Sequence, residues 1–512
     1  MFQRQPPRSP SRRPFLRWLR RLAALSVAAI ALGVAGGVWW WVTSPLDTIG
    51  AVAFERPLHI PPLAESTVDG DGTRVFELTA QQGTTPLHPD GVAKTWGFNG
   101  SYLGPTLRAE VGEKVKVEVR NELDETTTVH WHGMHLPADM DGGPHQPIEP
   151  GESWSPTWKI DQNAATLWYH PHPHGETEKH VYRGLAGMFI LDDPDDPVAD
   201  ILPHEYGVDD VPVIVQDKTF DDAGRLENSG FGDTIVVNGT YGPYLDVTTQ
   251  AVRLRLLNAS TVRVYEFGFS DDREYAVIAS DGGLLPEPVR TDRLRLSPGE
   301  RAEIVVRLDP GEETVLRSYR PDLGMDAFTG SFVGGRDRFD VLQLRAAPTL
   351  SVSPGVPDEL APAPDLTDAD GEPDRRFTLQ GTRINDRAMD MNRVDETVEV
   401  DTTEIWEVQN TDGTFHNFHV HDVQFQVLTV DGNRPPPELA GWKDTVLVTP
   451  GQQVHLALRF TDYTDPGTPY MFHCHLLQHE DHGMMGQFVV VEPGDTAEDP
   501  PEHDMTEHDH TP

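Results

Sequence analysis

The sequence predicts an all-β protein made of three consecutive β domains. Short runs that alternate apolar and polar residues, such as Lys114 to Val119, indicate half-buried strands, and no long amphipathic helix is evident. A strand that ends in Asn, followed by a Pro-Gly turn, recurs three times at intervals of about 150 residues. The 45 glycines and 44 prolines among 512 residues are also typical of a loop-rich β protein.

The repeat sets the predicted domain boundaries. Its turns are Pro150-Gly151-Glu152, Pro298-Gly299-Glu300 and Pro450-Gly451-Gln452, and the strands before them end at Asn121, Asn258 and Asn410. The predicted domains are 51–197, 198–346 and 375–494. A linker rich in Pro, Ala and Asp is expected at 347–374, and an acidic, His-containing tail at 495–512.

Residues 1–50 are predicted to be a targeting segment. Arg12-Arg13 resembles a twin-arginine export signal, and an apolar run from Leu22 to Val42 follows it. The run is long enough to span a bilayer and ends in three tryptophans, so a cleaved signal and an uncleaved transmembrane anchor both remain open. The expected partner is the twin-arginine export machinery, and the expected location is the periplasm or the outer face of the cytoplasmic membrane.

The formal net charge of −41 limits the class of partner. Such an acidic chain repels phosphates, which argues against binding to nucleic acid. It would attract a small cationic substrate such as a metal ion.

The segment around Cys474 carries the strongest chemical signal. Cys474 is the only cysteine, so it cannot form a disulfide within the chain. A thiolate, two imidazoles and a weak thioether are the ligands of a blue-copper site, and Cys474, His479 and Met484 can supply three of them. On a strand, His473 and His475 would point away from Cys474, so one strand could serve two metal sites.

Three further segments contain histidines in a His-x-His pattern, which places two imidazoles on one face of a strand. They are His130-Trp131-His132, His170-Pro171-His172 and His419-Val420-His421, with His416 just before the last. Imidazoles that converge from several segments can hold a copper cluster. Between Val181 and Phe415 the only histidine is His204, so the middle domain is expected to act as a spacer without ligands.

These four segments resemble the copper-binding motifs of the multicopper oxidases. Gly441 to Val446 and Met140 to Pro144 resemble the same family, and the likeness covers nearly all of the chain after residue 50. It is nearest to the three-domain bacterial group of cuprous oxidases, spore-coat laccase and bilirubin oxidase. The resemblance implies three consecutive cupredoxin-like Greek-key β-sandwich domains.

The resemblance also implies four copper ions. By motif, the type 1 ligands are His416, Cys474, His479 and Met484, the type 2 ligands are His130 and His419, and the type 3 ligands are His132, His170 and His475 for one ion and His172, His421 and His473 for the other. His170 and His172 are preferred to a pair that includes His174, because Trp168-Tyr169 before His170 matches the family. Met485 is the alternative to Met484 as the axial ligand of the type 1 copper.

The implied activity is the one-electron oxidation of a small donor, coupled to the reduction of dioxygen to water. Electrons would pass through Cys474 to His473 and His475, and Asp141 and Glu480 match family carboxylates that handle protons. The sequence leaves two kinds of electron donor as alternatives: a metal ion such as Cu(I), and a phenol or aromatic amine. Asp412 matches an acidic ligand of the cuprous oxidases, but Thr414 stands where that group has Met.

Three other functions are alternatives to the oxidase on this fold or on its sandwich domain. An exported cell-division scaffold shares the fold but has lost the copper ligands, whereas every ligand position is filled here. A copper store or carrier without turnover would have no use for the Cys474 connection. Copper nitrite reductases have the type 1 site but lack the paired His-x-His segments of a trinuclear cluster.

Overall fold

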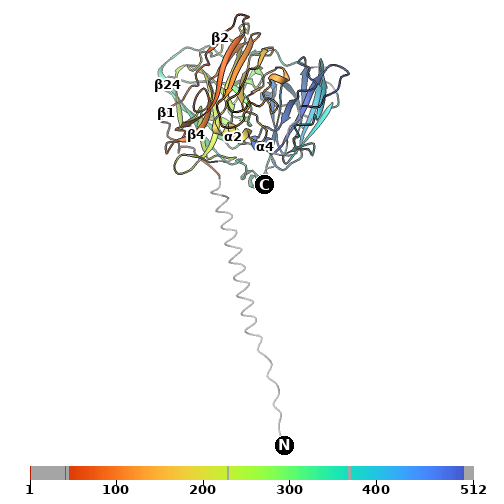
Figure 1. The fold of residues 1–512 in the computed structure, drawn as a ribbon. Coiled ribbons are helices and arrows are strands. Elements are labelled where there is room, and N and C mark those ends of the chain that lie inside the picture. The colour runs from red at the N-terminus through yellow and green to blue at the C-terminus, as the bar shows by residue number, and fades with distance from the viewer. Residues whose placement is uncertain (2–40, 42–44, 228–229, 367–370, 501–512) are drawn as a thin grey trace.

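The computed structural model describes residues 1, 41, 45–227, 230–366 and 371–500. Three β sandwiches follow one another along the chain and pack into one rounded body, with the third sandwich, in blue, on one side (Figure 1). This confirms the predicted all-β class. The predicted targeting signal falls almost wholly outside the described residues, as does most of the tail. Within the described ranges, no helix has the length and apolar character to cross a membrane.

The first sandwich holds its core between sheets of six and four strands. The larger sheet contains β2 (Ser66–Val68), β3 (Arg74–Thr85), β6 (Lys114–Asn121) and β8 (Ser153–Trp154), with β4 (Ala93–Phe98) paired to β3 and β9 (Thr157–Lys159) paired to β6. The smaller has the order β5 (Leu107–Glu110), β11 (Gly187–Asp192), β10 (Thr166–His170) and β7 (His130–His132). The short helices η1 (Ala138–Met140) and α2 (Thr177–Arg183) lie in its connections.

The second sandwich is the middle of the three along the chain. One sheet has the order β15 (Thr240–Tyr241), β14 (Thr234–Val237), β12 (Asp210–Phe220), β17 (Ala251–Asn258), β22 (Arg301–Arg307), β19 (Tyr275–Ser280) and β20 (Gly283–Thr291), with β13 (Leu226–Glu227) paired to β12. The other has the order β1 (Arg56–Pro57), β16 (Pro243–Thr249), β24 (Phe339–Ser351), β23 (Glu313–Tyr319), β18 (Tyr265–Phe269) and β21 (Leu294–Leu296). Strand β1 therefore joins this sandwich although it precedes the first one in the chain. Helix α3 (Ala327–Gly330) follows β23.

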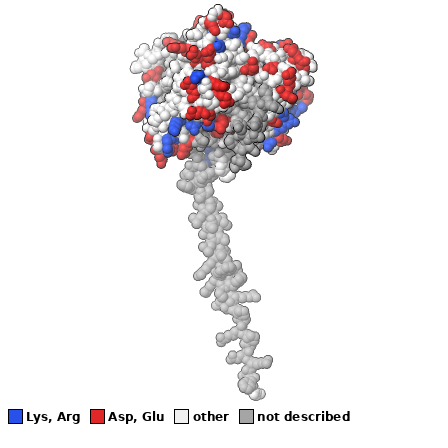
Figure 2. Space-filling model, viewed as in Figure 1, with Lys and Arg blue, Asp and Glu red and all other residues white. Residues whose placement is uncertain are grey.

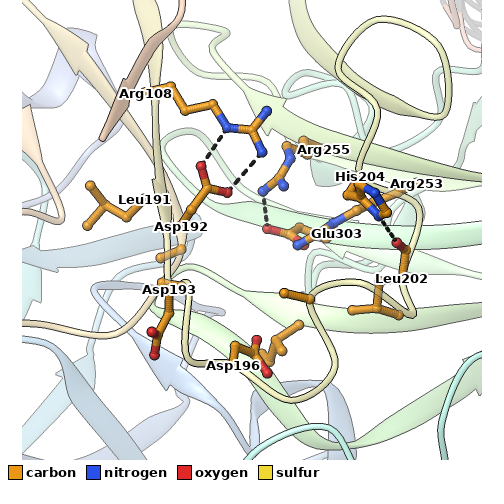
Figure 3. A pocket seen from close by; sticks show the side chains of 14 residues that line it. Arg108, Leu191, Asp192, Asp193, Asp196, Leu202, His204, Arg253, Arg255 and Glu303 are labelled. Carbon is orange, nitrogen blue, oxygen red and sulfur yellow. Dashed lines mark hydrogen bonds and ion pairs between the residues drawn. The ribbon is translucent and has the colours of Figure 1, made fainter. Parts of the chain in front are cut away.

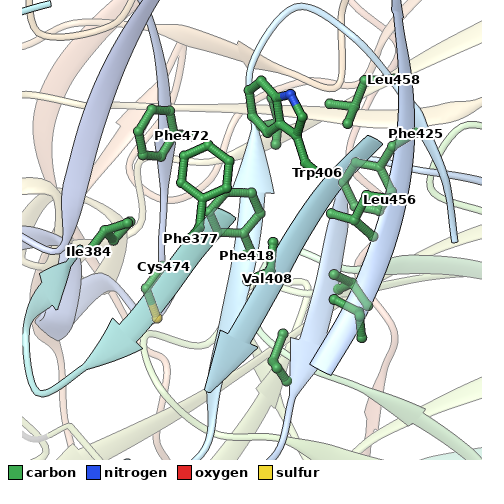
Figure 4. Close-up of a cluster of buried hydrophobic side chains, with 14 of the residues drawn as sticks. Phe377, Ile384, Trp406, Val408, Phe418, Phe425, Leu456, Leu458, Phe472 and Cys474 are labelled. Atoms are coloured by element: carbon green, nitrogen blue, oxygen red, sulfur yellow. The ribbon is translucent and has the colours of Figure 1, made fainter. Parts of the chain in front are cut away.

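The third sandwich has a strongly aromatic core. One sheet has the order β26 (Arg383–Ile384), β25 (Arg375–Gln380), β28 (Thr402–Asn410), β33 (Gln453–Phe460), β30 (Phe425–Val430) and β31 (Trp442–Lys443). The other has the order β27 (Glu396–Glu399), β35 (Met485–Val491), β34 (Tyr470–His473), β29 (His416–Val420) and β32 (Thr445–Val448). Helices η2 (Pro437–Leu439) and α4 (Leu477–Asp481) complete it. Figure 4 shows Phe377, Phe418 and Phe472 packed together, with Cys474 at the edge of the cluster. The apolar core thus holds the cysteine on one side.

The repeat seen in the sequence has the same geometry in all three sandwiches. The side chains of Asn121, Asn258 and Asn410 are fully buried, and each side-chain amide donates to two backbone carbonyls. The backbone carbonyl of each Asn accepts from the turn glycine at 2.8, 2.9 and 3.0 Å. The three glycines have φ of +81°, +87° and +77°, which favours glycine. Each Asn therefore ties the end of a strand to the turn that starts a later one.

An ionic network links the first two sandwiches, because Arg108 of the first lies 3.9 Å from Asp210 of the second. Arg108 pairs with Asp192, and Arg255 pairs with Glu303 at 2.8 Å, around a cavity of about 70 Å³ (Figure 3). Arg255 also pairs with Asp210 at 2.6 Å. Burial opposes ionisation of Asp210 and Glu303, but the neighbouring arginines outweigh it and lower the pKa of both carboxyls. These paired charges make the network a structural contact.

Candidate metal centre

Four histidine-bearing segments meet between the first and third sandwiches. Strand β7 carries His130 and His132 on one face, because alternate residues of a strand point the same way, and Trp131 between them enters the core of the first sandwich. Strand β10 runs antiparallel to β7 and brings His170 opposite His130. In the third sandwich, β29 pairs with β34 so that His419 lies opposite His473. Backbone pairing therefore fixes where these imidazoles point.

The first set of facing nitrogens joins His132, His170 and His475. His132 Nδ1 lies 3.4 Å from His170 Nε2, and His475 Nε2 lies 3.4 Å from the same atom. All three side chains are buried. This set contains the histidines assigned by resemblance to one type 3 copper.

The second set joins His172, His421 and His473. The Nε2 atoms of His172 and His421 each lie 3.2 Å from His473 Nε2. These are the histidines assigned to the other type 3 copper. Of the run His170-Pro171-His172-Pro173-His174, the first two histidines thus supply the two sets.

His130 and His419 form a third set. Their Nε2 atoms are buried and have no hydrogen-bond partner. The ligand atoms of His130, His419 and His421 all lie within 4.8 Å of one another. His130 and His419 are the residues assigned to the type 2 copper.

The opposite ring nitrogens of most of these histidines face acceptors. His132 Nε2 lies 3.0 Å from Asp444 Oδ1, and His421 Nδ1 lies 2.7 Å from Asp141 Oδ2. The outward nitrogens of five others face backbone carbonyls or Glu480: His130 (Asp141 O, 3.0 Å), His170 (Pro171 O, 2.9 Å), His419 (Asp444 O, 2.8 Å), His172 (Glu480 Oε1, 3.3 Å) and His473 (Glu480 Oε2, 3.2 Å). The Nδ1 atom of His475 is buried without a hydrogen-bond partner. An acceptor on the outer nitrogen holds the proton there, so the inner nitrogen presents a lone pair.

Imidazole nitrogens from different segments face one another inside the protein at 3.2–3.4 Å. Burial, followed by the neighbouring imidazoles, lowers the pKa of His132, His170, His419 and His421 well below its usual range. Burial lowers the pKa of His172 and His475 to about 3. These six rings are therefore neutral at pH 7, and each can offer one ring nitrogen to a metal ion. Neutral imidazole is a ligand suited to copper, so the residues fit this metal.

A second candidate site lies around Cys474, which follows the end of β34. Its Sγ lies 3.8 Å from His416 Nδ1 and 3.7 Å from His479 Nδ1, and the two imidazole nitrogens are 3.1 Å apart. Met484 is fully buried, and its backbone is hydrogen-bonded to both Cys474 and His479. Burial raises the pKa of the Cys474 thiol to about 12, so a bound cation is needed to make it a thiolate at pH 7.

Two carboxylates touch the histidines from behind. Asp141 Oδ2 contacts His421, and its Oδ1 lies 3.4 Å from His130 Nδ1. Glu480, on α4, faces His172 and His473. Burial raises the pKa of Glu480, but the two facing imidazoles outweigh it and lower the pKa well below the usual value. Both carboxylates are only 1% exposed.

Several residues that hold the centre together have no role in the assignment by motif. Asp444 accepts from His132 through its side chain and from His419 through its backbone carbonyl. Arg301, from the middle sandwich, donates to both oxygens of Asp444. The adjacent Lys443 and Asp444 are the sequence signal that could have revealed this support, because two charged residues inside an otherwise apolar strand segment require buried partners.

His135 also has a defined role. Its ring links the sandwiches, with Nδ1 2.7 Å from Asp422 Oδ1 and Nε2 2.6 Å from Asp462 Oδ1. Burial alone would lower its pKa, but the two carboxylates raise it to about 10. His135 is therefore an interface cation at neutral pH.

Comparison with known proteins identifies the family. Residues 80–196 and 358–494 match models described as multicopper oxidase. The multicopper oxidase mco of Staphylococcus haemolyticus is 36% identical over 453 residues, covering 85% of this chain and 93% of that protein. The cell division protein FtsP of Escherichia coli is 38% identical over 484 residues, covering 92% and 99%. The solved structure of the multi-copper oxidase from Pediococcus acidilactici is 36% identical, with a TM-score of 0.78, covering 88% and 94%. The chain belongs to the multicopper oxidase family, whose members use copper, dioxygen and a reducing substrate.

Proposed function

We propose that this protein is a working oxidase that couples the one-electron oxidation of a small donor to the reduction of dioxygen to water. The observation that carries the proposal is the convergence of buried imidazoles whose ring nitrogens face one another at 3.2–3.4 Å. Imidazole nitrogens that converge from several segments are the ligand set of a copper cluster.

In this proposal the ligands of four copper ions are those assigned by motif. They are His416, Cys474, His479 and Met484 for type 1, His130 and His419 for type 2, and His132, His170, His475 and His172, His421, His473 for the type 3 pair. Bound copper would supply the one-electron redox steps and the binding and reduction of dioxygen.

The chain's own residues connect the two sites and supply protons. Cys474 is covalently joined to His473 and His475, one from each set of facing nitrogens, so the backbone gives an electron a short path between the sites. Asp141 and Glu480 contact ring nitrogens of the histidine sets, and we assign them the transfer of the protons that dioxygen reduction consumes.

The donor would meet the protein near His416. His416 Nε2 lies 3.3 Å from Asp412 Oδ2, and the Asp412 side chain is 27% exposed. Burial opposes ionisation of Asp412, but backbone N–H groups and His416 lower its pKa, which keeps it anionic. Acidic side chains also spread over the face shown in Figure 2. A metal cation is favoured by this charge, and a phenol or aromatic amine is compatible with it.

We further propose that the protein is exported by the twin-arginine route and works outside the cytoplasm. Arg12-Arg13 and the apolar run from Leu22 to Val42 support export, and the run is long enough to serve as an anchor. The boundaries 51–197, 198–346 and 375–494 remain our proposal for the three domains.

A second candidate is a scaffold of the same fold that works without turnover. The likeness to the cell division protein FtsP favours it. The filled set of buried donors argues for the oxidase, because a scaffold needs none of them.

Oxygen uptake by the copper-loaded protein distinguishes the two candidates. Purified protein loaded with copper is mixed in separate assays with Cu(I), Fe(II) and a phenol. The oxidase predicts oxygen consumption with at least one donor, lost on copper removal and restored on reloading. Protein that binds copper but consumes no oxygen with any donor would leave the scaffold or a copper carrier as the better account.

A further inference from the structure

The middle sandwich sends one turn, Ser297 to Arg301, into the space between the two candidate copper sites. We propose that this turn, chiefly through Arg301, is a positioning element that holds the trinuclear histidines in the orientation that copper requires. The proposal rests on the proposed function, because it concerns how the same centre is built. It replaces the expectation that the middle domain is a spacer.

The Arg301 side chain is fully buried, and all five of its N–H donors have acceptors. Its Nη1 and Nη2 donate to the two carboxylate oxygens of Asp444 at 2.7 and 2.6 Å. The remaining donors go to the carbonyls of Thr166, Gly299 and Asp281 at 3.0, 3.0 and 3.1 Å. One guanidinium thus joins the first, second and third sandwiches.

Asp444 transmits this contact to the histidines. Its Oδ1 accepts from His132 Nε2, which holds the proton there and leaves Nδ1 facing His170. Its backbone carbonyl accepts from His419 Nδ1, which leaves Nε2 free inside the cluster. The bidentate pairing with Arg301 keeps the Asp444 carboxylate in one plane and balances its charge. Arg301 therefore acts on His132 through a single intermediate side chain.

The same turn touches a third histidine directly. A Cβ added to Gly299 would meet the His475 ring at 3.0 Å, so the glycine allows the turn to approach this imidazole closely. The corresponding glycines of the other two repeats, Gly151 and Gly451, have open space at this position. Only the middle copy of the repeat is therefore placed as a support for a cluster histidine.

The turn also reaches the Cys474 site. The Asn417 side-chain amide donates to Ser297 Oγ at 3.1 Å and to the Pro298 carbonyl at 2.8 Å. These bonds point Asn417 Oδ1 at Cys474 Sγ, 3.5 Å away. All five side-chain donors of Arg301 go to Thr166, Gly299, Asp281 and Asp444, so a change at Arg301 should affect the histidine cluster and spare Cys474.

The test compares two buried arginines of the middle sandwich. Arg255, like Arg301, makes a bidentate pair with an aspartate and contacts Thr166, but its partners, Asp210 and Glu303, touch no candidate ligand. Arg301→Met and Arg255→Met therefore remove the same chemistry at a similar cost in stability. Wild type and both variants are loaded with copper, then compared by copper content, by the near-ultraviolet type 3 band, by the blue thiolate band and by thermal unfolding.

We expect Arg301→Met to bind copper at the histidine cluster about 10- to 100-fold more weakly and to lose the near-ultraviolet band, while it keeps the blue band. Arg255→Met should keep both bands despite a lower melting temperature. Arg301→Lys, which keeps the charge but not the bidentate pair, should fall between wild type and Arg301→Met, and it decides the matter if Arg301→Met does not fold.

Two results would overturn the positioning role. One is full copper content with an unchanged near-ultraviolet band in the Arg301 variants. The other is equal loss of the band in Arg255→Met, which would reduce the effect to general destabilisation. Failure of the wild type itself to bind copper would instead refute the proposed function.

Discussion

At the scale of single residues, the chemistry of the centre depends on where protons are held. Acceptors behind His132 and His421 hold the proton on the outer nitrogen, and burial keeps these rings neutral. Cys474 behaves in the opposite sense, because burial favours its protonated form, with a pKa of about 12. The imidazoles are therefore ready to bind a cation, whereas the Cys474 thiol becomes a thiolate at neutral pH only when a cation is bound.

Cys474→Ser tests the connection between the two sites. Serine keeps the size of the side chain but cannot supply a thiolate, so the blue band and donor-driven oxygen uptake should both fall to background. The near-ultraviolet band should remain, because the histidine sets do not include Cys474. Oxygen uptake that survives this change would refute the proposed electron path.

Asp141→Asn tests the proton role of a carboxylate. The amide can still contact His421 but cannot hold an exchangeable acid proton, so copper content should stay at the wild-type level while oxygen turnover falls by about 10²- to 10⁴-fold. Turnover and copper content are measured on the same sample. Equal turnover in both proteins would remove Asp141 from the proton path.

The depressed histidine pKa values predict acid sensitivity of the copper-free protein. His172, His475 and His479 have pKa values of about 3 in the folded state against an ordinary value of 6.5. The unfolded chain therefore binds more protons between these values, and stability falls as pH drops from about 6.5 towards 3. The melting temperature of copper-free protein should decrease between pH 7 and pH 5, and bound copper should reduce the decrease. A flat or rising profile would contradict the neutral, buried state of these rings.

At the scale of secondary-structure elements, periodicity predicted the strands well. The alternating run Lys114 to Val119 lies within β6, and the run Val454 to Phe460 lies within β33. The opposed directions of Cys474 and its neighbours are expected if the segment is a strand; β34 ends at His473, and His479 and Glu480 lie on the short helix α4. A helix of five residues leaves too little periodicity for the sequence to reveal it.

The repeated Asn-to-turn contact predicts a measurable share of stability. Asn121→Ala would leave the carbonyls of Glu125, part-buried, and Ile148, buried, without this donor, at an expected cost of about 2–3 kcal/mol in the free energy of unfolding. Denaturant unfolding measures the loss, with the exposed Asn433→Ala as a comparison for loss of a less buried amide. A cost below about 0.5 kcal/mol would show that the contact is incidental.

At the scale of the whole molecule, the sequence revealed the ligands but not what supports them. Histidines in His-x-His patterns and the sole cysteine are local signals, so their grouping could be read from the chain. Arg301 is 143 residues from Asp444, and no local pattern pairs them. Their contact arises from packing of the second sandwich against the third, which periodicity does not encode.

His135, Asp422 and Asp462 form an ionic clamp between the first and third sandwiches, and this clamp makes the stability of their interface depend on pH. Asp422 and Asp462 raise the His135 pKa from 6.5 to about 10, so its stabilisation is fully present below about pH 6.5 and is lost as pH rises through 10. His135→Gln should therefore lower the melting temperature at pH 7 and have a smaller effect near pH 10.5. Equal effects at both pH values would exclude a charged clamp.

Cys474 is proposed to connect a donor site to a dioxygen-reducing cluster, and a spectroscopic experiment tests this connection. Copper-loaded protein is reduced without air, and its blue band is followed as dioxygen is admitted. We predict that the band bleaches on reduction and returns in air, with one dioxygen consumed for every four electrons stored. A blue band that stays bleached in air, or copper-loaded protein with no blue band, would contradict the account.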